Sequence, residues 1–208
     1  MRYLELSDVA AVRILCFDMT CAFDGIPHEL LLSRVSNLPL SHVKAFVNWL
    51  NDYLMDRQQQ TKLGTTKSTI ADVTSGVPQG SLLGPYLFSL YMSSYKPASS
   101  NVRIVKYADD ISLIIPVYKR DSDDLSPTSL EVRMFKAWCD DNKMLINHSK
   151  TKVMNVNFSN FPMHSLDEYE NVTNLKILGL ICNCKLTWSS HFDYIISCIS
   201  RRLYALHI

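Results

Sequence analysis

Apolar and polar positions follow one another in blocks that predict alternating strands and helices. Residues 12–17 (VRILCF) form a short apolar run rich in branched side chains, which is typical of a buried strand. Residues Ser41 to Met55 place apolar side chains at helical spacing and predict an amphipathic helix. The mostly apolar residues 82–94 predict another helix, despite Gly84 and Pro85. The pattern therefore indicates a fold that mixes both kinds of element.

Turn and capping signals predict how these elements begin and connect. Asp24 is expected to cap the helix that follows it, with Pro27 in the first turn, because short acidic side chains accept hydrogen bonds from the free N–H groups of a helix. Residues 57–64 and 68–76 predict a pair of strands joined by the segment 64–67, which begins with a glycine.

The second half of the chain continues the alternation. A strand is expected to run into Asp109 and Asp110, and the apolar residues 111–117 to leave them as a second strand, so that the two form a hairpin. The polar residues 119–129 predict a loop. The remaining segments predict a helix over residues 130–142, strands over 151–158 and 174–182, and an amphipathic helix from Ser189 onward.

Asp109 and Asp110 place two like charges inside an apolar run. A turn is one interpretation, because aspartate is common in turns. Two-residue hairpin turns, however, favour Asn-Gly, Asp-Gly or Gly-Gly, and the sequence here is Ala-Asp-Asp. Adjacent carboxylates repel each other, and a bound cation or a raised pKa relieves that repulsion. A surface turn and a metal site are both compatible with the pair.

Composition and charge limit the class of protein but do not select a partner. The 208 residues are 47% hydrophobic, which suits one domain with a sizeable core. Lysine and arginine total 21 against 20 aspartate and glutamate, so the net charge gives no argument for nucleic-acid binding.

Cysteine spacing and hydropathy predict the compartment. Cys182 and Cys184 are too close together for a usual zinc site, and Cys16 and Cys21 are expected to be small buried hydrophobic residues. The first residues lack the pattern of a signal peptide, and no apolar run approaches the roughly 20 residues of a membrane span. We therefore expect reduced thiols, no membrane partner and an intracellular location, in the cytoplasm or the nucleus.

Five segments occur in an order and spacing that resemble one known family. The first contains Asp-x-x-x-Ala-Phe-Asp, the second Pro-Gln-Gly and the third Tyr-x-Asp-Asp, and the fourth and fifth contain a lysine and a Leu-Gly pair. Together they resemble the reverse transcriptase of non-LTR (LINE-type) retrotransposons over residues 12–208. The segments are FDMTCAFDGIPHELLL (17–32), SGVPQGSLLGPYLFSLYM (75–92), KYADDISL (106–113), NHSKTKVM (147–154) and LKILGLICNCKLTWSSHFDYI (175–195).

The resemblance implies an architecture. Residues 1–185 are expected to form an α+β polymerase palm with an antiparallel sheet, packed helices and connecting elements of the fingers and palm. Residues 186–208 are expected to begin a thumb helix. The fingers are expected to be largely missing and the thumb truncated, so the chain is expected to be a fragment of a retrotransposon polyprotein with little activity alone.

The resemblance also implies a reaction and its metal site. The family is an RNA-directed DNA polymerase, in which the 3′-hydroxyl of a DNA primer attacks the α-phosphate of a deoxynucleoside triphosphate on an RNA template, so that one deoxynucleotide is added and pyrophosphate is released. Asp18, Asp109 and Asp110 are expected to hold two Mg²⁺ ions, with Mn²⁺ as a possible substitute, because these cations prefer carboxylate oxygens. Lys150 is expected to lie near the leaving pyrophosphate and to supply a proton or positive charge.

The resemblance assigns nucleotide binding to Phe23, Gln79 and Gly80. An aromatic ring at Phe23 would block a 2′-hydroxyl and favour deoxynucleotides, and the alternative for this residue is an ordinary core phenylalanine. Gln79 and Gly80 are expected to contact nucleotide and template, and the alternative is a simple turn before a helix. For Lys150 the alternative is a solvated surface lysine, and the same two interpretations apply to Lys152.

Three residues outside these assignments carry weaker expectations. Tyr107 is expected to pack near the primer terminus. Arg201 and Arg202 would contact a nucleic-acid backbone or lie on a solvated helical face. For the whole chain, the alternative to a polymerase is a non-catalytic remnant of the palm fold that binds nucleic acid or another protein.

Overall fold

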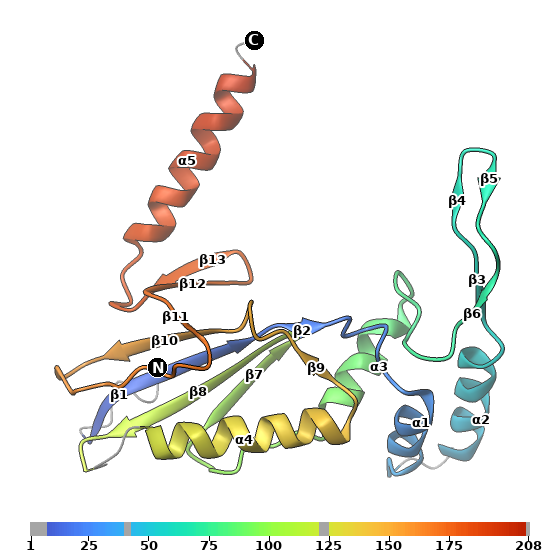
Figure 1. Ribbon diagram of the computed structural model, residues 1–208, viewed down its shortest axis with the longest axis horizontal. Helices are drawn as coiled ribbons and strands as arrows, with labels where there is room; N and C mark the ends of the chain where they lie inside the picture. Colours follow the sequence, from blue (N-terminus) through green and yellow to red (C-terminus); the bar gives the residue numbers. More distant parts are fainter. Residues whose placement is uncertain (1–7, 40–42, 121–124, 207–208) are drawn as a thin grey trace.

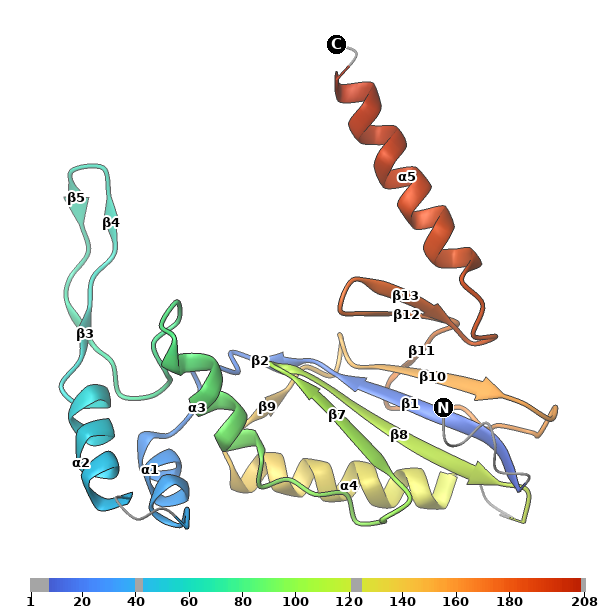
Figure 2. The same ribbon diagram turned by 180° about the vertical axis from the view of Figure 1, so that it is seen from behind.

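A central sheet forms the base of the molecule, and two projections rise from the same side of it (Figure 1; Figure 2 gives the reverse view). The computed structural model describes residues 8–39, 43–120 and 125–206. The helices are α1 (His28–Ser36), α2 (Val43–Leu54), α3 (Leu83–Met92), α4 (Leu125–Asp141) and α5 (Ser189–Leu206).

The central sheet has five strands in the order β11-β10-β1-β8-β7. All neighbouring pairs are antiparallel except β10 and β11, which are parallel. The helices and this sheet confirm the predicted α+β class. The strands of the sheet are β1 (Val9–Phe17), β7 (Arg103–Tyr107), β8 (Asp110–Tyr118), β10 (Lys152–Asn157) and β11 (Glu170–Asn171).

β1 lies at the centre of this sheet and pairs on both sides. Ile14 is opposite Met154 of β10 on one side and opposite Ile114 of β8 on the other. Most of its residues are buried, which explains why the strand reads as a continuous apolar run and not as an alternating one. Its register therefore fixes the position of every other strand of the sheet.

The two faces of the sheet have apolar cores of different size. On one face, Leu15 and Phe17 of β1 join a large cluster with α3 and α4, in which Phe135 lies 4.4 Å from Phe17 between ring centroids. On the other face, a small cluster around Met154 packs against Leu175. Leu175 belongs to the hairpin formed by β12 (Asn174–Ile177) and β13 (Leu180–Asn183). The helical face therefore carries most of the hydrophobic stabilisation.

The two projections stand at opposite ends of the base (Figure 1). At one end, α1 and α2 pack together and lead into a long polar hairpin, which confirms the predicted strand pair. At the other end, α5 extends away from the β12–β13 hairpin, as predicted from its amphipathic pattern. The strands of the polar hairpin are β3 (Gln58–Gln59), β4 (Lys62–Leu63), β5 (Thr66–Lys67) and β6 (Ala71–Asp72).

Two predicted helix starts were wrong. Helix α1 begins at His28 after Pro27, without a side-chain capping bond, so Asp24 does not cap it. Helix α4 begins at Leu125 and not at residue 130, because Pro127 falls in the first turn, where a missing N–H costs no helical hydrogen bond. Residues 121–124 of the predicted loop, and residues 41–42 of the predicted second helix, lie outside the described residues.

Two further predictions were wrong. Residues 174–182 do not form one strand, because Leu178 and Gly179 both take positive φ angles, of 49° and 85°, and turn the chain into the β12–β13 hairpin. Positive φ at both central residues is the requirement of a type I′ hairpin turn. Cys21 is exposed and not buried, whereas Cys16 is partly buried against Ser112.

The short strands β2 (Met19–Thr20) and β9 (Leu145–Ile146) were not predicted. They pair with each other just beyond the end of β1. Two residues are too few to give a periodic pattern. Within the described ranges, no helix has the length and apolarity needed to cross a bilayer.

Arg13 is a fully buried cation in the middle of β1. Its guanidinium donates to Asn155 Oδ1 at 2.9 Å, to Thr128 Oγ1 at 3.0 Å and to the His164 carbonyl at 2.7 Å. These acceptors lie on β10, on α4 and in the segment after β10. Arg13 therefore ties three parts of the fold to the central strand, and its hydrogen bond to Thr128 is fully buried.

Replacing this side chain should destabilise the fold. We expect Arg13→Ala to lower the free energy of unfolding by about 3–5 kcal/mol, because it leaves a cavity and removes the donor from the buried Thr128 hydroxyl and from two partly buried acceptors. Urea denaturation followed by circular dichroism measures the change. Arg202→Ala, which alters an exposed arginine of α5, should change the same quantity by less than about 0.5 kcal/mol. Equal, small effects of the two substitutions would contradict this account of Arg13.

Candidate active site

The strand register brings three carboxylates to one end of the sheet. Phe17, the last residue of β1, is opposite Ile111 of β8, and the next residues along the two strands are Asp18 and Asp110. Tyr107 of β7 pairs with Asp110, so that Ala108 and Asp109 form the hairpin turn. We call Asp18, Asp109 and Asp110 the carboxylate cluster.

The turn that carries Asp109 is unusual in its chemistry. Ala108 has a φ of 50°, in the left-handed region that residues with a Cβ rarely adopt. Asp109 therefore lies in the turn and Asp110 begins β8, and the turn is built without the glycine or asparagine that relieves this conformation. Backbone strain of this kind persists where the surrounding structure enforces it, and it is concentrated at functional sites.

The three carboxylates influence one another electrostatically. The pKa of Asp110 is raised above its ordinary value, first by partial burial of the carboxyl group and then by the negative charges of Asp109 and Asp18. Like charges disfavour ionisation of a neighbouring acid. The repulsion inferred from the sequence is thus present between strands as well as within the Asp109–Asp110 pair.

Lys150 is the cation that the structure brings to this cluster. Its Nζ lies 3.8 Å from Asp18 Oδ2. The turn that carries it is held against β1, because the Asn147 N–H donates to the Asp18 carbonyl at 2.8 Å, and Thr151 Oγ1 accepts from the Asp18 N–H at 3.4 Å. Lys152 points to a different partner, since its Nζ lies 3.4 Å from Glu170. The structure therefore distinguishes the two lysines.

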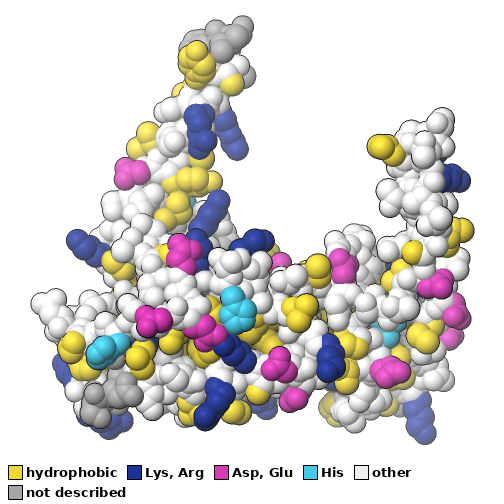
Figure 3. Space-filling view, viewed as in Figure 1, with side chains coloured by type: hydrophobic (Ala, Val, Ile, Leu, Met, Phe, Trp, Pro, Cys, Tyr) yellow, Lys and Arg dark blue, Asp and Glu magenta, His cyan; other side chains and the backbone are white. Residues whose placement is uncertain are grey.

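A cavity of about 460 Å³ opens beside the cluster. It lies between the end of β1 and the β12–β13 hairpin, and its lining combines acidic and basic side chains. In the space-filling view the molecule is deeply hollowed between its two projections (Figure 3). The polar and charged residues that line the cavity include Asp18, Asp110, Lys150, Lys152, Glu170 and Lys176.

Phe23, Gln79 and Gly80 occupy the segments that follow Asp18 and precede α3. The Phe23 ring is half-buried and stacks on Phe88 of α3, with 4.5 Å between centroids and 24° between planes. Gln79 and Gly80 are exposed in the loop before α3, and Gln79 Nε2 donates to Asp24 Oδ1 at 2.8 Å. The sequence analysis did not predict the hydrogen bond between Gln79 and Asp24, because 55 residues separate them along the chain.

A second contact that sequence reasoning missed fixes the strand that carries the hairpin. Lys106 of β7 is half-buried, and its Nζ donates to the carbonyls of Met92 at 2.5 Å and Tyr95 at 3.1 Å, where α3 ends. Free carbonyls at a helix C-terminus attract a cation. Burial lowers the pKa of Lys106, and the nearby charge of Arg34 lowers it further. The strand before the acidic turn is thereby anchored to α3.

The remaining candidates lie on exposed surfaces. Tyr107 is 63% exposed beside the acidic turn. Arg201 and Arg202 are exposed on α5, and Arg201 Nε donates to the Ser197 carbonyl of its own helix at 3.3 Å. The exposure of Arg201 and Arg202 is compatible with both interpretations given for them, and the packing of Tyr107 near a primer terminus stays a prediction.

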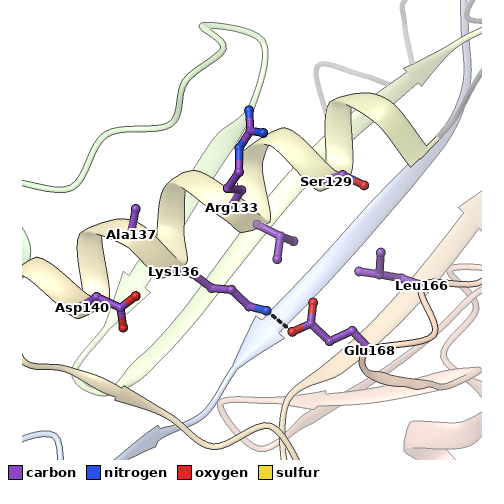
Figure 4. A pocket seen from close by; sticks show the side chains of 8 residues that line it. Ser129, Arg133, Lys136, Ala137, Asp140, Leu166 and Glu168 are labelled. Atoms are coloured by element: carbon purple, nitrogen blue, oxygen red, sulfur yellow. Dashed lines mark hydrogen bonds and ion pairs between the residues drawn. The ribbon is translucent and has the colours of Figure 1, made fainter.

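A separate pocket of about 390 Å³ lies against α4 (Figure 4). Its lining contains no member of the carboxylate cluster. Lys136 of α4 forms an ion pair with Glu168 across it, and His148 Nδ1 lies 3.6 Å from the same carboxylate. The ion pair links α4 to the segment before β11, and we assign it a structural role.

Comparison with known proteins places these features in a family. The family model described as reverse transcriptase (RNA-dependent DNA polymerase) matches residues 7–182. Among curated relatives from Drosophila melanogaster, the chain is 30% identical over 193 residues to the RNA-directed DNA polymerase from mobile element jockey. It is 28% identical over 191 residues to the probable RNA-directed DNA polymerase from transposon BS. These alignments cover 86% and 84% of this chain but only 20% of each relative.

Solved structures support the fold independently. A telomerase from Candida tropicalis, truncated from its C-terminal domain, has a TM-score of 0.59 at 14% identity, covering 89% of this chain and 36% of that one. A telomerase from Candida albicans, in complex with a fragment of telomeric RNA, has a TM-score of 0.57 at 14% identity and covers 86% and 31%. With the family model matching most of its length, the chain belongs to the reverse transcriptase family, and its relatives are polymerases of non-LTR retrotransposons.

Proposed function

We propose that this chain carries the catalytic carboxylates of an RNA-directed DNA polymerase. The observation that carries the proposal is the meeting of Asp18, Asp109 and Asp110 at adjoining strand ends, where the pKa of Asp110 is raised first by partial burial and then by the other two charges. The chain spans about a fifth of the length of the curated relatives it matches. The activity is therefore proposed for the protein in which this segment acts.

The carboxylate cluster suits divalent cations by the chemistry of its donors. Carboxylate oxygens are the ligands that Mg²⁺ prefers, and a cation would relieve the repulsion that raises the pKa of Asp110. Within the described ranges, however, no group of three or more histidine, cysteine or acidic side chains is already arranged to hold a metal. We assign metal binding to Asp18 and Asp109, with Asp110 supporting the same site.

When bound, two Mg²⁺ ions, or Mn²⁺ in their place, would stabilise charge on the attacking and leaving oxygens of nucleotidyl transfer. The protein's own part is to hold those carboxylates at fixed strand ends and to present a cation. We propose that Lys150, whose Nζ lies 3.8 Å from Asp18 Oδ2, supplies positive charge or a proton to the leaving pyrophosphate.

The proposed substrates are an RNA template, a DNA primer and deoxynucleoside triphosphates. Phe23 is supported as a selector of the sugar by its fixed stacking on Phe88, and Gln79 and Gly80 by their exposure in the loop before α3. We propose residues 1–185 as the palm with connecting elements and residues 186–208 as the start of a thumb.

Removal of one carboxylate charge should abolish the reaction. We expect Asp109→Asn in the full-length protein to reduce primer extension on poly(rA)–oligo(dT) with Mg²⁺ by about 10²-fold or more, because the charge that holds the metal is lost. Asp141→Asn, at the exposed end of α4, should leave the rate unchanged. A folded wild-type protein without Asp109-dependent extension would favour the non-catalytic alternative.

Ionisation of the carboxylate cluster should lower the free energy of unfolding. The folded-state pKa of Asp110 is raised, so the folded state binds more protons than the unfolded chain between the ordinary and the raised value. The protonated Asp110 carboxyl therefore stabilises the fold at low pH, and this contribution is lost as the pH rises from the ordinary to the raised pKa. We expect Asp110→Asn to raise the free energy of unfolding at pH 7 without Mg²⁺, and this gain to vanish below about pH 4.

Urea denaturation of this chain at the two pH values measures the effect. Asp141→Asn serves again as the matched control. Added Mg²⁺ should stabilise the wild-type chain more than the Asp110→Asn variant, because a ligand stabilises the state that binds it. A loss of stability in Asp110→Asn at pH 7 would show that the carboxylate is paired in the fold and would contradict the proposed repulsion.

A further inference from the structure

The segment after β2 and the loop before α3 are joined along their backbones. The Gly76 N–H donates to the Ile26 carbonyl at 2.8 Å, and the Val77 N–H donates to the Phe23 carbonyl at 2.9 Å. Gly76 has a φ of 84°, and a Cβ added to it would lie 2.7 Å from Asp24 Cα. Only glycine permits so close an approach of two backbones.

Side chains reinforce this junction. His28 is buried, and its Nε2 lies within hydrogen-bond distance of the Gly76 carbonyl, at 2.8 Å. Ser75 Oγ donates to the Asp24 carbonyl at 2.8 Å. The backbones of Asp24 and of the loop before α3 are therefore held in a fixed relation before any ligand binds.

The Asp24 carboxylate is available to act on this loop. It does not cap α1, and it accepts a hydrogen bond from Gln79 Nε2 at 2.8 Å. An ionised carboxylate only accepts hydrogen bonds, so it selects the NH₂ end of the glutamine amide. The second N–H and the Oε1 of Gln79 are left for a ligand.

We propose that Asp24 is a positioning residue, whose carboxylate holds the Gln79 amide in one orientation for the incoming deoxynucleotide. The inference rests on the polymerase function proposed above. A glutamine side chain loses rotamer freedom when a ligand immobilises it, and a side chain already held in place loses less. Both side chains are exposed, so the hydrogen bond contributes little to stability and acts mainly on binding.

The polar hairpin supplies a matched control. Asp72 Oδ1 accepts from Gln58 Nε2 at 2.9 Å, and both side chains are exposed. This pair repeats the chemistry, the distance and the exposure of the Asp24–Gln79 pair. It lies on β3 and β6, outside the loop before α3. Asp72→Ala therefore removes an equivalent hydrogen bond at a site with no proposed role in nucleotide binding.

The test is steady-state primer extension by the full-length protein on poly(rA)–oligo(dT), with dTTP varied. We expect Asp24→Ala to raise the KM for dTTP about 3- to 10-fold, with kcat changed less than about 2-fold and an unchanged melting temperature. In the Gln79→Ala background, Asp24→Ala should add nothing, because the two residues act through one contact. Asp24→Asn keeps an acceptor oxygen and should restore the wild-type KM. Asp72→Ala should have no effect.

A second variant keeps the test independent of the folding of Asp24→Ala. Gln79→Glu places a like charge opposite Asp24 and should raise the KM, and Asp24→Asn added to it should reverse part of the increase, because the asparagine amide can donate to the new carboxylate. In an active wild-type protein, an unchanged KM for Asp24→Ala, or additive effects of the Asp24 and Gln79 substitutions, would overturn the inference. Absence of any Asp109-dependent extension in the wild type would instead refute the proposed function.

Discussion

The antiparallel pairing of β1 with β8, which ends with Phe17 opposite Ile111, determines where the acidic side chains meet. Side chains alternate between the faces of a sheet, so a slip of one residue would turn Leu15 and Phe17 of β1 away from the large core. It would also move Asp18 away from Asp110. The large apolar core around Leu15 and Phe17 thus specifies the register, and the register specifies the carboxylate cluster.

Stability and function oppose each other at this end of the sheet. The carboxylates repel one another, and Ala108 holds a backbone conformation that favours glycine. Contacts elsewhere offset both costs. Lys106 anchors β7 to the end of α3, Asn147 and Thr151 hold the backbone of Asp18, and Arg13 joins β1 to its neighbours. Functional sites often carry local destabilisation that the rest of a fold must support.

The sequence predicted those elements whose apolar pattern is long enough to show a period. The acidic hairpin, the central strand β1 and helix α5 are of this kind. The β12–β13 hairpin was missed, because its turn residues Leu178 and Gly179 lie inside an apolar run that resembles a single strand. The start of α4 was misplaced, because Pro127 was taken as a loop residue.

The candidate site was predictable only where a local pattern in the sequence marks a residue. Local motifs identified Asp18, Asp109 and Asp110 as candidates, but no local pattern shows which distant side chains they meet. The contact between Asp24 and Gln79 depends on the approach of two backbones at Gly76. Since Asp24 precedes a helix, its proximity to the helix start favoured capping over a contact made through the tertiary fold.

The buried hydrogen bonds of Arg13 have a consequence for synthesis on the ribosome. Its partner Asn155 lies 142 residues further along the chain, so β1 emerges long before the strand that completes its environment. At translation rates of about 5–20 residues per second, that delay is roughly 7–28 s. Ile114 of β8, which pairs with Ile14, follows it by 100 residues. For most of the delay, an apolar strand with a cation at its centre therefore has neither neighbour in place. The nascent chain is therefore expected to need chaperone protection until β8 and β10 have been made.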